Sequence, residues 1–402
     1  MNRSLFLHVV ERLEGLVNRL PGTIQKPILH ELTPLKQLFL QQRPPRFVFG
    51  GSPNTPLSQL MSALFPEFAP TELGISASRK DHWRDFNLGD RGTISILDAR
   101  NTRPGDAIGK ELEAAPADVI FFVDDEDRKK MRKEPLDNLA DLIGRNRRHG
   151  AHPGVVGIIY DPGAPELDGD DKPRSAWKER ASRLSTTLES KLSNETPLLR
   201  ILAVRGSGQS EGAADVISAI GRHLPNEARI ETARVFGDKQ TQAEIAQMLV
   251  KSTSAICTAI GAQPIPLADL PILTTLQLVM VSGIMYVSGR ERSLRAATEF
   301  VAALGANVGV GMLLREGARA LLKFIPGWGN VVCGMVAGAG TYAIGRAAIA
   351  YFLEGLTLKE ARRTYLSSRR RSRGQVHLNS TGHEKRPAIE SPKRSRRLRL
   401  RG

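Results

Sequence analysis

The sequence predicts a doubly wound α/β domain, followed by an all-α, apolar, glycine-rich helical domain and a disordered basic tail. Two observations lead to this prediction. Short apolar runs alternate with helical periodicity in the first half of the chain, whereas long uncharged stretches and then a basic segment fill the second half. We divide the chain into N-terminal helices (1–43), the α/β domain (44–226), the helical domain (227–360) and the tail (361–402).

The N-terminal residues 1–42 carry apolar side chains at helical spacing, interrupted by Pro21, Pro27 and Pro34. Proline in a helix interior removes a hydrogen bond and clashes with the preceding turn. The sequence therefore predicts several short helices that pack on the segments that follow.

The α/β domain is predicted from five apolar runs that alternate with amphipathic segments. The strands are RFVFG, TISILDA, DVIFFVDD, VVGIIY and LLRILAV, and the helices are SQLMSALF and segments near 107–114, 136–146, 176–192 and 212–223. Runs such as 119–123 and 155–159 are apolar without alternation, which is typical of strands buried on both faces of a mostly parallel sheet.

A glycine turn, GGSPNTPLSQLMSALFPE, joins the first strand to the first helix at the place where nucleotide-binding proteins carry a phosphate loop. The pattern G-x-x-x-x-G-K-[ST], laid from Gly51, puts Pro56 at the second glycine, Leu57 at the lysine and Ser58 at the Ser/Thr position. The start of the helix after Pro56 still favours an anion.

The segment GSPNTPLSQLMSAL (51–64) resembles G-R-P-N-V-G-K-S-S-L-[IL]-N-A-L of the Era/TrmE-like GTPases, and ADVIFFVDD (117–125) resembles their ADVILFVVDA strand. The resemblance implies a P-loop GTPase-like domain. Carried over residue by residue, it implies that Gly51, Asn54, Ser58 and Asp98 line a nucleotide site. It also implies that Ser58 and Asp98 hold Mg²⁺, although the glycine of the family's D-T-P-G motif is missing after Asp98.

Three motifs of that family are degraded here. The phosphate loop lacks its lysine and second glycine, D-T-P-G lacks its glycine, and N-K-x-D, which reads guanine, falls on YDPG (160–163). Losing the lysine's charge-assisted hydrogen bond costs about 1.5–3 kcal/mol, or roughly ten- to a hundredfold in affinity. We therefore expect GTP with Mg²⁺ to bind weakly or not at all.

The second half of the chain contains QPIPLAD (263–269), IPGWG (325–329) and YAIGRA (342–347). Over about residues 242–360 it resembles the helical domain of YcjF-type bacterial proteins, which often follows Era-like G domains. The resemblance implies a module of unknown activity that is often associated with a membrane.

Two uncharged stretches, 270–289 and 324–345, approach the roughly 20 residues of a membrane-spanning helix. The second contains Pro326 and six glycines, and G-x-x-x-G spacings allow helices to approach closely. The pattern fits either a membrane hairpin or a tightly packed soluble bundle.

The tail holds 14 Lys or Arg against Glu384 and Glu390, a net charge of +12 that leaves only +3 for the other 360 residues. This composition predicts disorder. The tail is either simply solvated or docks on an anionic surface. Lipid head groups are favoured over RNA because no aromatic side chains interleave to stack on bases.

The predicted location is cytoplasmic, with association with or insertion into the inner membrane left open. Cys257 and Cys333 lie in apolar surroundings, as in a reducing compartment, and the opening MNRSLFLHVVERLEG has no secretory cleavage site. The function best supported is a pseudo-GTPase scaffold that acts at the inner face of a membrane through its apolar helical domain, for protein partners that the sequence does not identify. The alternative is a divergent but active GTPase, supported by Gly51, Asn54, Ser58 and Asp98.

Overall fold

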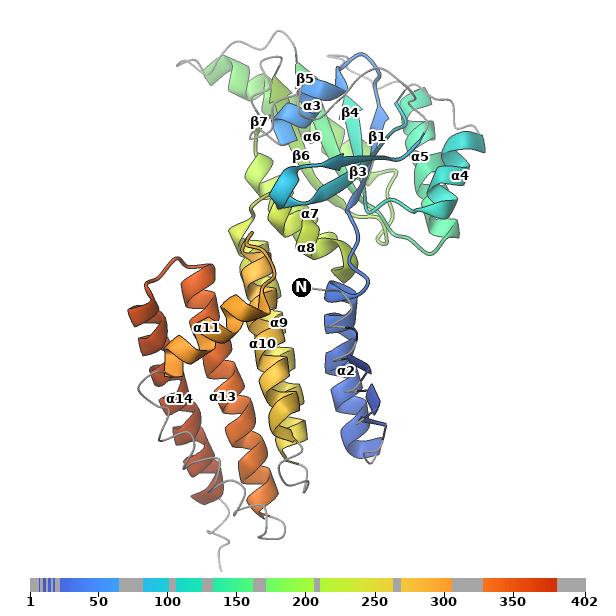
Figure 1. Ribbon diagram of the computed structural model, residues 1–402. Coiled ribbons are helices and arrows are strands. Elements are labelled where there is room, and N and C mark those ends of the chain that lie inside the picture. The colour runs from blue at the N-terminus through green and yellow to red at the C-terminus, as the bar shows by residue number, and fades with distance from the viewer. Residues whose placement is uncertain are drawn as a thin grey trace, which may run out of the picture.

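The computed structural model describes residues 22–64, 82–100, 106–124, 133–161, 171–205, 210–262, 269–305 and 328–381, together with seven separate positions between 7 and 18. An α/β sheet is followed by a helical region, which lies beyond one end of the sheet (Figure 1). The prediction of a mostly parallel α/β sheet followed by helices is thus confirmed.

The sheet contains seven strands in the order β2-β3-β1-β4-β5-β6-β7. The pairs formed among β3, β1, β4, β5 and β6 are parallel, whereas β2 and β7 pair antiparallel at the two edges. Neither edge strand was predicted from the sequence. The strands are β1 Arg46–Gly51, β2 Arg84–Asn87, β3 Thr93–Asp98, β4 Val119–Asp124, β5 Gly154–Asp161, β6 Leu198–Arg205 and β7 Ser210–Glu211.

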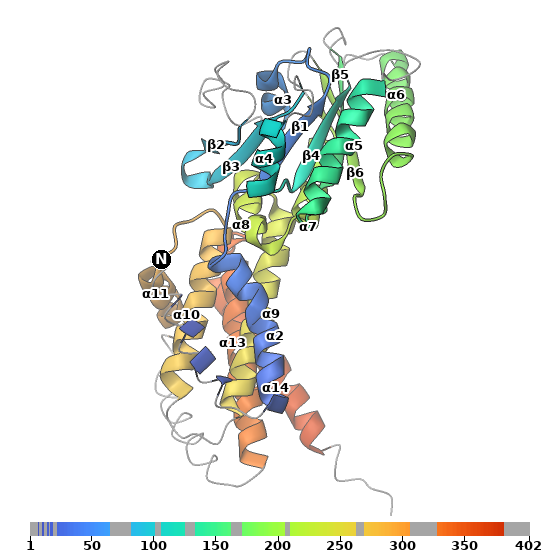
Figure 2. The same cartoon turned by 90° about the vertical axis from the view of Figure 1, so that its right-hand side faces the viewer.

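Helices cover both faces of the sheet (Figure 2). Along β1, Phe47 and Phe49 join the core formed with α3, α7 and α8, while Val48 joins the core formed with α4, α5 and α6. The continuous apolar runs of the sequence follow from this arrangement, because both faces of each central strand are buried. The helices are α3 Leu57–Leu64, α4 Asp106–Ala114, α5 Lys133–Arg148, α6 Asp171–Glu189, α7 Ala213–His223 and α8 Asn226–Val235.

The helical region has one apolar core. Its longest helices, α9, α10, α13 and α14, lie side by side, and α2 packs on α8 and α9. Its helices are α2 Gly22–Phe39, α9 Lys239–Gly261, α10 Asp269–Val287, α11 Leu294–Gly305, α13 Trp328–Phe352 and α14 Leu358–Thr381.

The prediction of short N-terminal helices is wrong for residues 22–39. Helix α2 runs through Pro27 and Pro34 without a break. Its buried face, which includes Leu32, Leu35 and Leu38, packs in the helical core and offsets the cost of roughly 3 kcal/mol for an interior proline.

Helix α8 belongs to both parts of the molecule. Ala228 and Val235 lie in the core of the sheet, whereas Ile230 and Ala233 lie in the core of the helical region. A helix shared in this way holds the two parts against each other through apolar contact.

Within the residues that the structure describes, no helix is long and apolar enough to cross a membrane. The uncharged stretch 270–289 falls mostly on α10, and the part of 324–345 that is described falls on α13. Glycines of α13 permit close packing on α9: a Cβ at Gly334 would lie 2.6 Å from the Thr258 carbonyl oxygen, and a Cβ at Gly338 would lie 1.8 Å from the Thr258 hydroxyl.

The prediction of disorder from residue 361 onward is also wrong for residues 361–381, because α14 extends to Thr381. Ala361 and Tyr365, one helical turn apart, are buried in the helical core. The helix begins with a capping box: the Thr357 amide donates to Glu360 Oε2 (2.9 Å) and the Glu360 amide donates to Thr357 Oγ1 (3.4 Å). Residues 382–402 lie outside the described residues.

Candidate functional site

The residues selected from the sequence lie at the carboxyl edge of the sheet, where ligands of doubly wound domains bind. Gly51 ends β1 and Asp98 ends β3, and these strands are parallel neighbours in which Phe49 pairs with Asp98. Ser58 lies in the first turn of α3 and is half-buried. Asn54 is exposed in the loop between β1 and α3.

Gly51 has a structural reason for being glycine. Its φ is +93°, and a Cβ at this position would lie 2.3 Å from the carbonyl oxygen of Val123 in β4. The loop therefore leaves β1 by a path that only glycine permits. This close approach also brings the Ser52 amide within 2.8 Å of the same carbonyl, so that N–H is already bonded to the protein.

The two residues that replace the loop glycine and lysine supply nothing for a phosphate. Pro56 has no N–H, and its carbonyl accepts from the Gln59 and Leu60 amides at the start of α3. Leu57 is buried in the apolar core between α3 and the sheet. The α3 N-terminus therefore keeps its dipole but has no cation of its own.

Arg100 supplies a cation at this edge from an unexpected position. Its Nε donates to Asp98 Oδ1 (2.8 Å), its Nη2 donates to Asp98 Oδ2 (2.9 Å), and its Nη1 donates to the Thr55 carbonyl of the loop. The Arg100 side chain is 5% exposed and that of Asp98 is 14% exposed. A bidentate, largely buried ion pair thus ties the end of β3 to the loop after β1.

This arrangement does not fit a Mg²⁺–nucleotide group. Mg²⁺ requires oxygen ligands at about 2.0–2.1 Å, and both oxygens of Asp98 already accept hydrogen bonds from Arg100. The guanidinium also occupies the space between Asp98 and the loop, and it would repel a metal cation. Ser58 and Asp98 lie at the same edge of the sheet, and the Asp98 carboxylate is paired with Arg100.

At the positions where the Era/TrmE-like GTPases carry their fourth and fifth motifs, this chain has Tyr160 and Arg205, and both side chains contact the protein itself. Tyr160, at the N-K-x-D position, donates its hydroxyl proton to Gln59, and its carbonyl accepts from Arg180 Nη2 (3.4 Å). Arg205, at the fifth motif, lies over the Trp177 ring at 5.8 Å from the centroid. Residues 162 and 163 of the motif lie outside the described residues.

In the part of the chain that the structure describes, the thiol and the candidate metal ligands form no further site. Burial raises the pKa of the Cys257 thiol to about 12, so at neutral pH it is a protonated core residue and not a nucleophile. Across the described parts of the chain, no group of three or more His, Cys, Asp or Glu side chains is placed to hold a metal ion.

Arg100 was missed from the sequence, although the signal was present. The stretch Asp98-Ala99-Arg100-Asn101 puts an arginine where the resembled family has the proline of D-T-P-G. An arginine two residues after a strand-terminal aspartate can fold back onto it, but the pairing requires the local turn that only the structure reveals.

No family model matches the chain. Over 118 residues, 28% of the chain, it is 30% identical to magnetosome membrane protein 22 of Magnetospirillum gryphiswaldense. The similarity covers 59% of that protein, so the chain spans less than two thirds of this relative. The chain therefore has a distant relative that is named as a membrane protein.

Proposed function

We propose that this chain is a GTPase-superfamily-like protein with degraded nucleotide-binding motifs, and that it acts as a pseudo-GTPase scaffold at the inner face of a membrane. The observation that supports this most strongly is the Arg100 guanidinium, which bonds both oxygens of Asp98 and the loop carbonyl of Thr55. Phosphoryl-transfer sites use cations and metal ions that contact the nucleotide phosphates. Here the cation is the Arg100 guanidinium, and its hydrogen-bond acceptors belong to the chain itself.

The ion pair between Asp98 and Arg100 has a consequence for switching. In nucleotide-dependent switches, the γ-phosphate and its metal order loops that are released on hydrolysis. The Asp98–Arg100 pair holds the loop between β1 and α3 with bonds that no nucleotide makes or breaks. The α/β domain is then a fixed shape for protein contacts, which is the behaviour of a scaffold.

The first expected result is that nucleotides do not bind. We expect titration calorimetry of the full chain with GTP, GDP and ATP, each with Mg²⁺, to show no saturable heat up to millimolar nucleotide, because the loop lacks its lysine and Asp98 is paired. Micromolar binding of GTP alone would contradict the proposal. If Ser58→Ala or Asp98→Ala then abolished saturable hydrolysis, the chain would be an active divergent GTPase.

The membrane part of the proposal is supported by the distant relative's name and by the basic C-terminal segment. We expect the full chain to float with vesicles that contain an anionic lipid at low salt but not with neutral vesicles. Removal of residues 382–402, which takes away eight Lys or Arg, should weaken this binding. Each such residue near an anionic surface contributes about 1 kcal/mol.

The control is the same vesicle assay at high salt, where screening should release an electrostatically bound chain. A chain that fails to float with anionic vesicles at low salt would contradict the membrane assignment. RNA binding with a steep salt dependence that disappears with residues 382–402 would reassign the basic segment to nucleic acid.

A further inference from the structure

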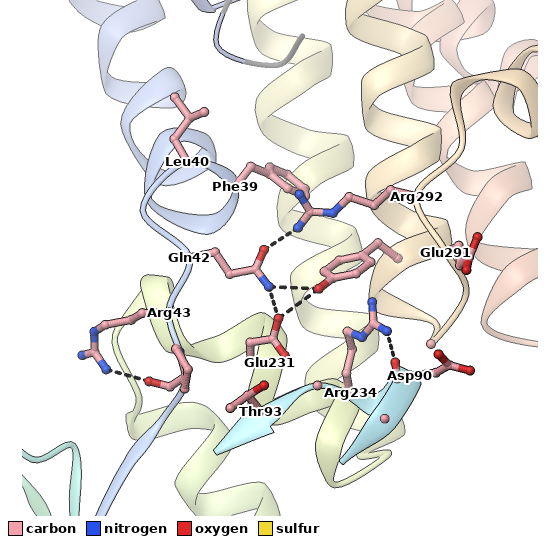
Figure 3. Close-up of a pocket in the computed structure, with 15 residues that line it drawn as sticks. Phe39, Leu40, Gln42, Arg43, Asp90, Thr93, Glu231, Arg234, Glu291 and Arg292 are labelled. Carbon is pink, nitrogen blue, oxygen red and sulfur yellow. Dashed lines mark hydrogen bonds between the residues drawn. The ribbon is translucent and has the colours of Figure 1, made fainter. Parts of the chain in front are cut away.

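A cavity of about 840 Å³ lies between the sheet and the helical region (Figure 3). It is bounded by the end of α2 and the residues after it, the 3₁₀ turn Gly89–Arg91 with the start of β3, helix α8, and the turn that follows α10. Ligand pockets typically measure about 300–1,000 Å³. The cavity therefore has the size of a small-molecule site, and it lies at the opposite end of β3 from Asp98.

The cavity wall includes a tyrosine between two arginines. The guanidinium carbons of Arg234 and Arg292 lie 3.7 and 3.9 Å from the centroid of the Tyr286 ring. At such short distances a guanidinium must stack on a face of the Tyr286 ring. Each face has room for one guanidinium, so the two arginines lie on opposite faces of the ring. The Tyr286 hydroxyl donates to Glu231 Oε1 (2.9 Å), and Gln42 Nε2 donates to the Tyr286 hydroxyl (3.2 Å).

Hydrogen bonds through Gln42 link Arg292 of this wall to the carboxylate of Glu231. Glu231 accepts from Tyr286 and Gln42, and Gln42 Oε1 accepts from Arg292 Nη2, as Figure 3 shows for the labelled residues. Burial, together with the neighbouring charge of Arg234, lowers the pKa of Arg292. The lining as a whole carries three arginines, Arg43, Arg234 and Arg292, and three carboxylates, Asp90, Glu231 and Glu291, so its charges balance in number, and the case for a ligand rests on the hydrogen bonds of Arg234.

Arg234 is the residue whose bonds are incomplete. It is only 8% exposed, and its Nη2 donates to the Asp90 carbonyl. Within the described part of the chain, its Nε and Nη1 have no hydrogen-bond partner. A buried cation needs partners for its donors, and both nitrogens are closed to solvent, so an acceptor in the cavity would gain these hydrogen bonds by a shift of the Arg234 side chain toward it.

We propose that this cavity binds a small molecule through a carboxylate or phosphate group that accepts hydrogen bonds from Arg234. Arg292 supplies a second positive charge, and the Tyr286 ring keeps the two guanidiniums apart and in place. Asp90 and Glu291, which are exposed at the cavity, disfavour extended polyanions such as nucleic acids. The site therefore suits a compact ligand with one oxyanion group.

Helix α8 packs closely on the sheet beside the cavity. Gly92 has a φ of +125°, and a Cβ there would lie 2.0 Å from Glu231 Oε2. Because the cavity wall is formed by both parts of the molecule, a bound anion would join the α8 side to the 3₁₀ turn of the sheet. Binding would stabilise the full chain by mass action.

The test is calorimetric titration of the full chain with inorganic phosphate, sulfate and succinate, at constant ionic strength and against chloride. We expect saturable binding of at least one probe. Arg234→Gln should weaken it at least tenfold, the change that loss of one charge-assisted hydrogen bond produces. Arg295→Gln, an equal charge change at an exposed pair on α11, should leave it unchanged.

Ser58→Ala separates this site from residual anion binding at the start of α3, and should not change the affinity. Arg234→Lys keeps the positive charge and is the second variant if Arg234→Gln does not fold; it should also lose about tenfold. The absence of saturable heat from the wild-type chain with all three probes would overturn the proposal. So would an Arg234→Gln or Arg234→Lys chain that binds as tightly as wild type.

Discussion

Replacing Arg100 with alanine is expected to lower the free energy of unfolding of the α/β domain by about 3–5 kcal/mol, because removing one partner of a buried ion pair leaves the other charge without compensation. Asp98 would lose its two side-chain donors, Nε and Nη2 of Arg100, and keep only the bond from the amide of residue 100, while the Thr55 carbonyl would lose its donor Nη1. The Thr55 side chain is buried, and its hydroxyl has no hydrogen-bond partner among the described residues, so it does not replace the lost bond.

The measurement is urea unfolding of the full chain in a Trp328→Phe background, in which fluorescence comes from Trp83 and Trp177 beside the sheet. Arg145→Ala is the matched control, since it removes an arginine of a partly exposed i,i+4 pair with Asp141 and should cost no more than about 1 kcal/mol. An Arg100→Ala chain as stable as this control would show that the pair does not hold the loop. Mg²⁺-dependent nucleotide binding that appears only in Arg100→Ala would show that Arg100 is what excludes the metal.

The central sheet could be predicted because its physical cause is local in the sequence. Residues 119–123 and 155–159 are apolar on consecutive positions because helices cover both faces of β4 and β5. Strand β2 was missed for the opposite reason: in RDFN only Phe86 is buried, and an edge strand with one buried side chain has no apolar run. Its existence depends on pairing with β3.

The helical region shows how tertiary packing overrides local preference. The prolines of α2 argue for a break, and the basic composition after residue 361 argues for disorder, yet both segments are helical where a few side chains reach the core. The capping box at Thr357 and Glu360 was a readable signal for the start of α14. The buried pair Ala361 and Tyr365 was not, because its partner helices are distant in the sequence.

Part of the candidate site could likewise be predicted from the sequence, and part could not. Chain order and the resemblance were enough to place Gly51, Ser58 and Asp98 at one edge of the sheet. The direction of the Arg100 side chain depends on a turn. The wall of the interdomain cavity depends on contacts such as Gln42 with Tyr286, which are 244 residues apart. No local pattern encodes a contact of that range, so this part of the molecule emerges only from the fold.

Asp118 connects these parts and gives the second large expected effect. It lies immediately before β4 and is 5% exposed. Its carboxylate accepts two hydrogen bonds of 2.7 Å from Arg43, in the segment between α2 and β1, and one of 2.9 Å from the Arg46 amide. The pair therefore anchors the chain where it passes from the helical region into the sheet.

We expect Asp118→Ala to lower the free energy of unfolding by about 2–4 kcal/mol, since Arg43 is 25% exposed and recovers only part of its hydration. Burial lowers the pKa of Arg43, but the hydrogen bonds and charge of Asp118, with a smaller contribution from the charge of Glu227, more than reverse this, so its pKa is raised; without Asp118 the effect of burial would prevail. Asp118→Asn keeps the shape and one acceptor and should lose less, and Asp141→Ala should cost under about 1 kcal/mol. Equal, small losses in Asp118→Ala and Asp118→Asn would mean that the segment after α2 is held by the apolar packing of α2 and α8 and not by this ion pair.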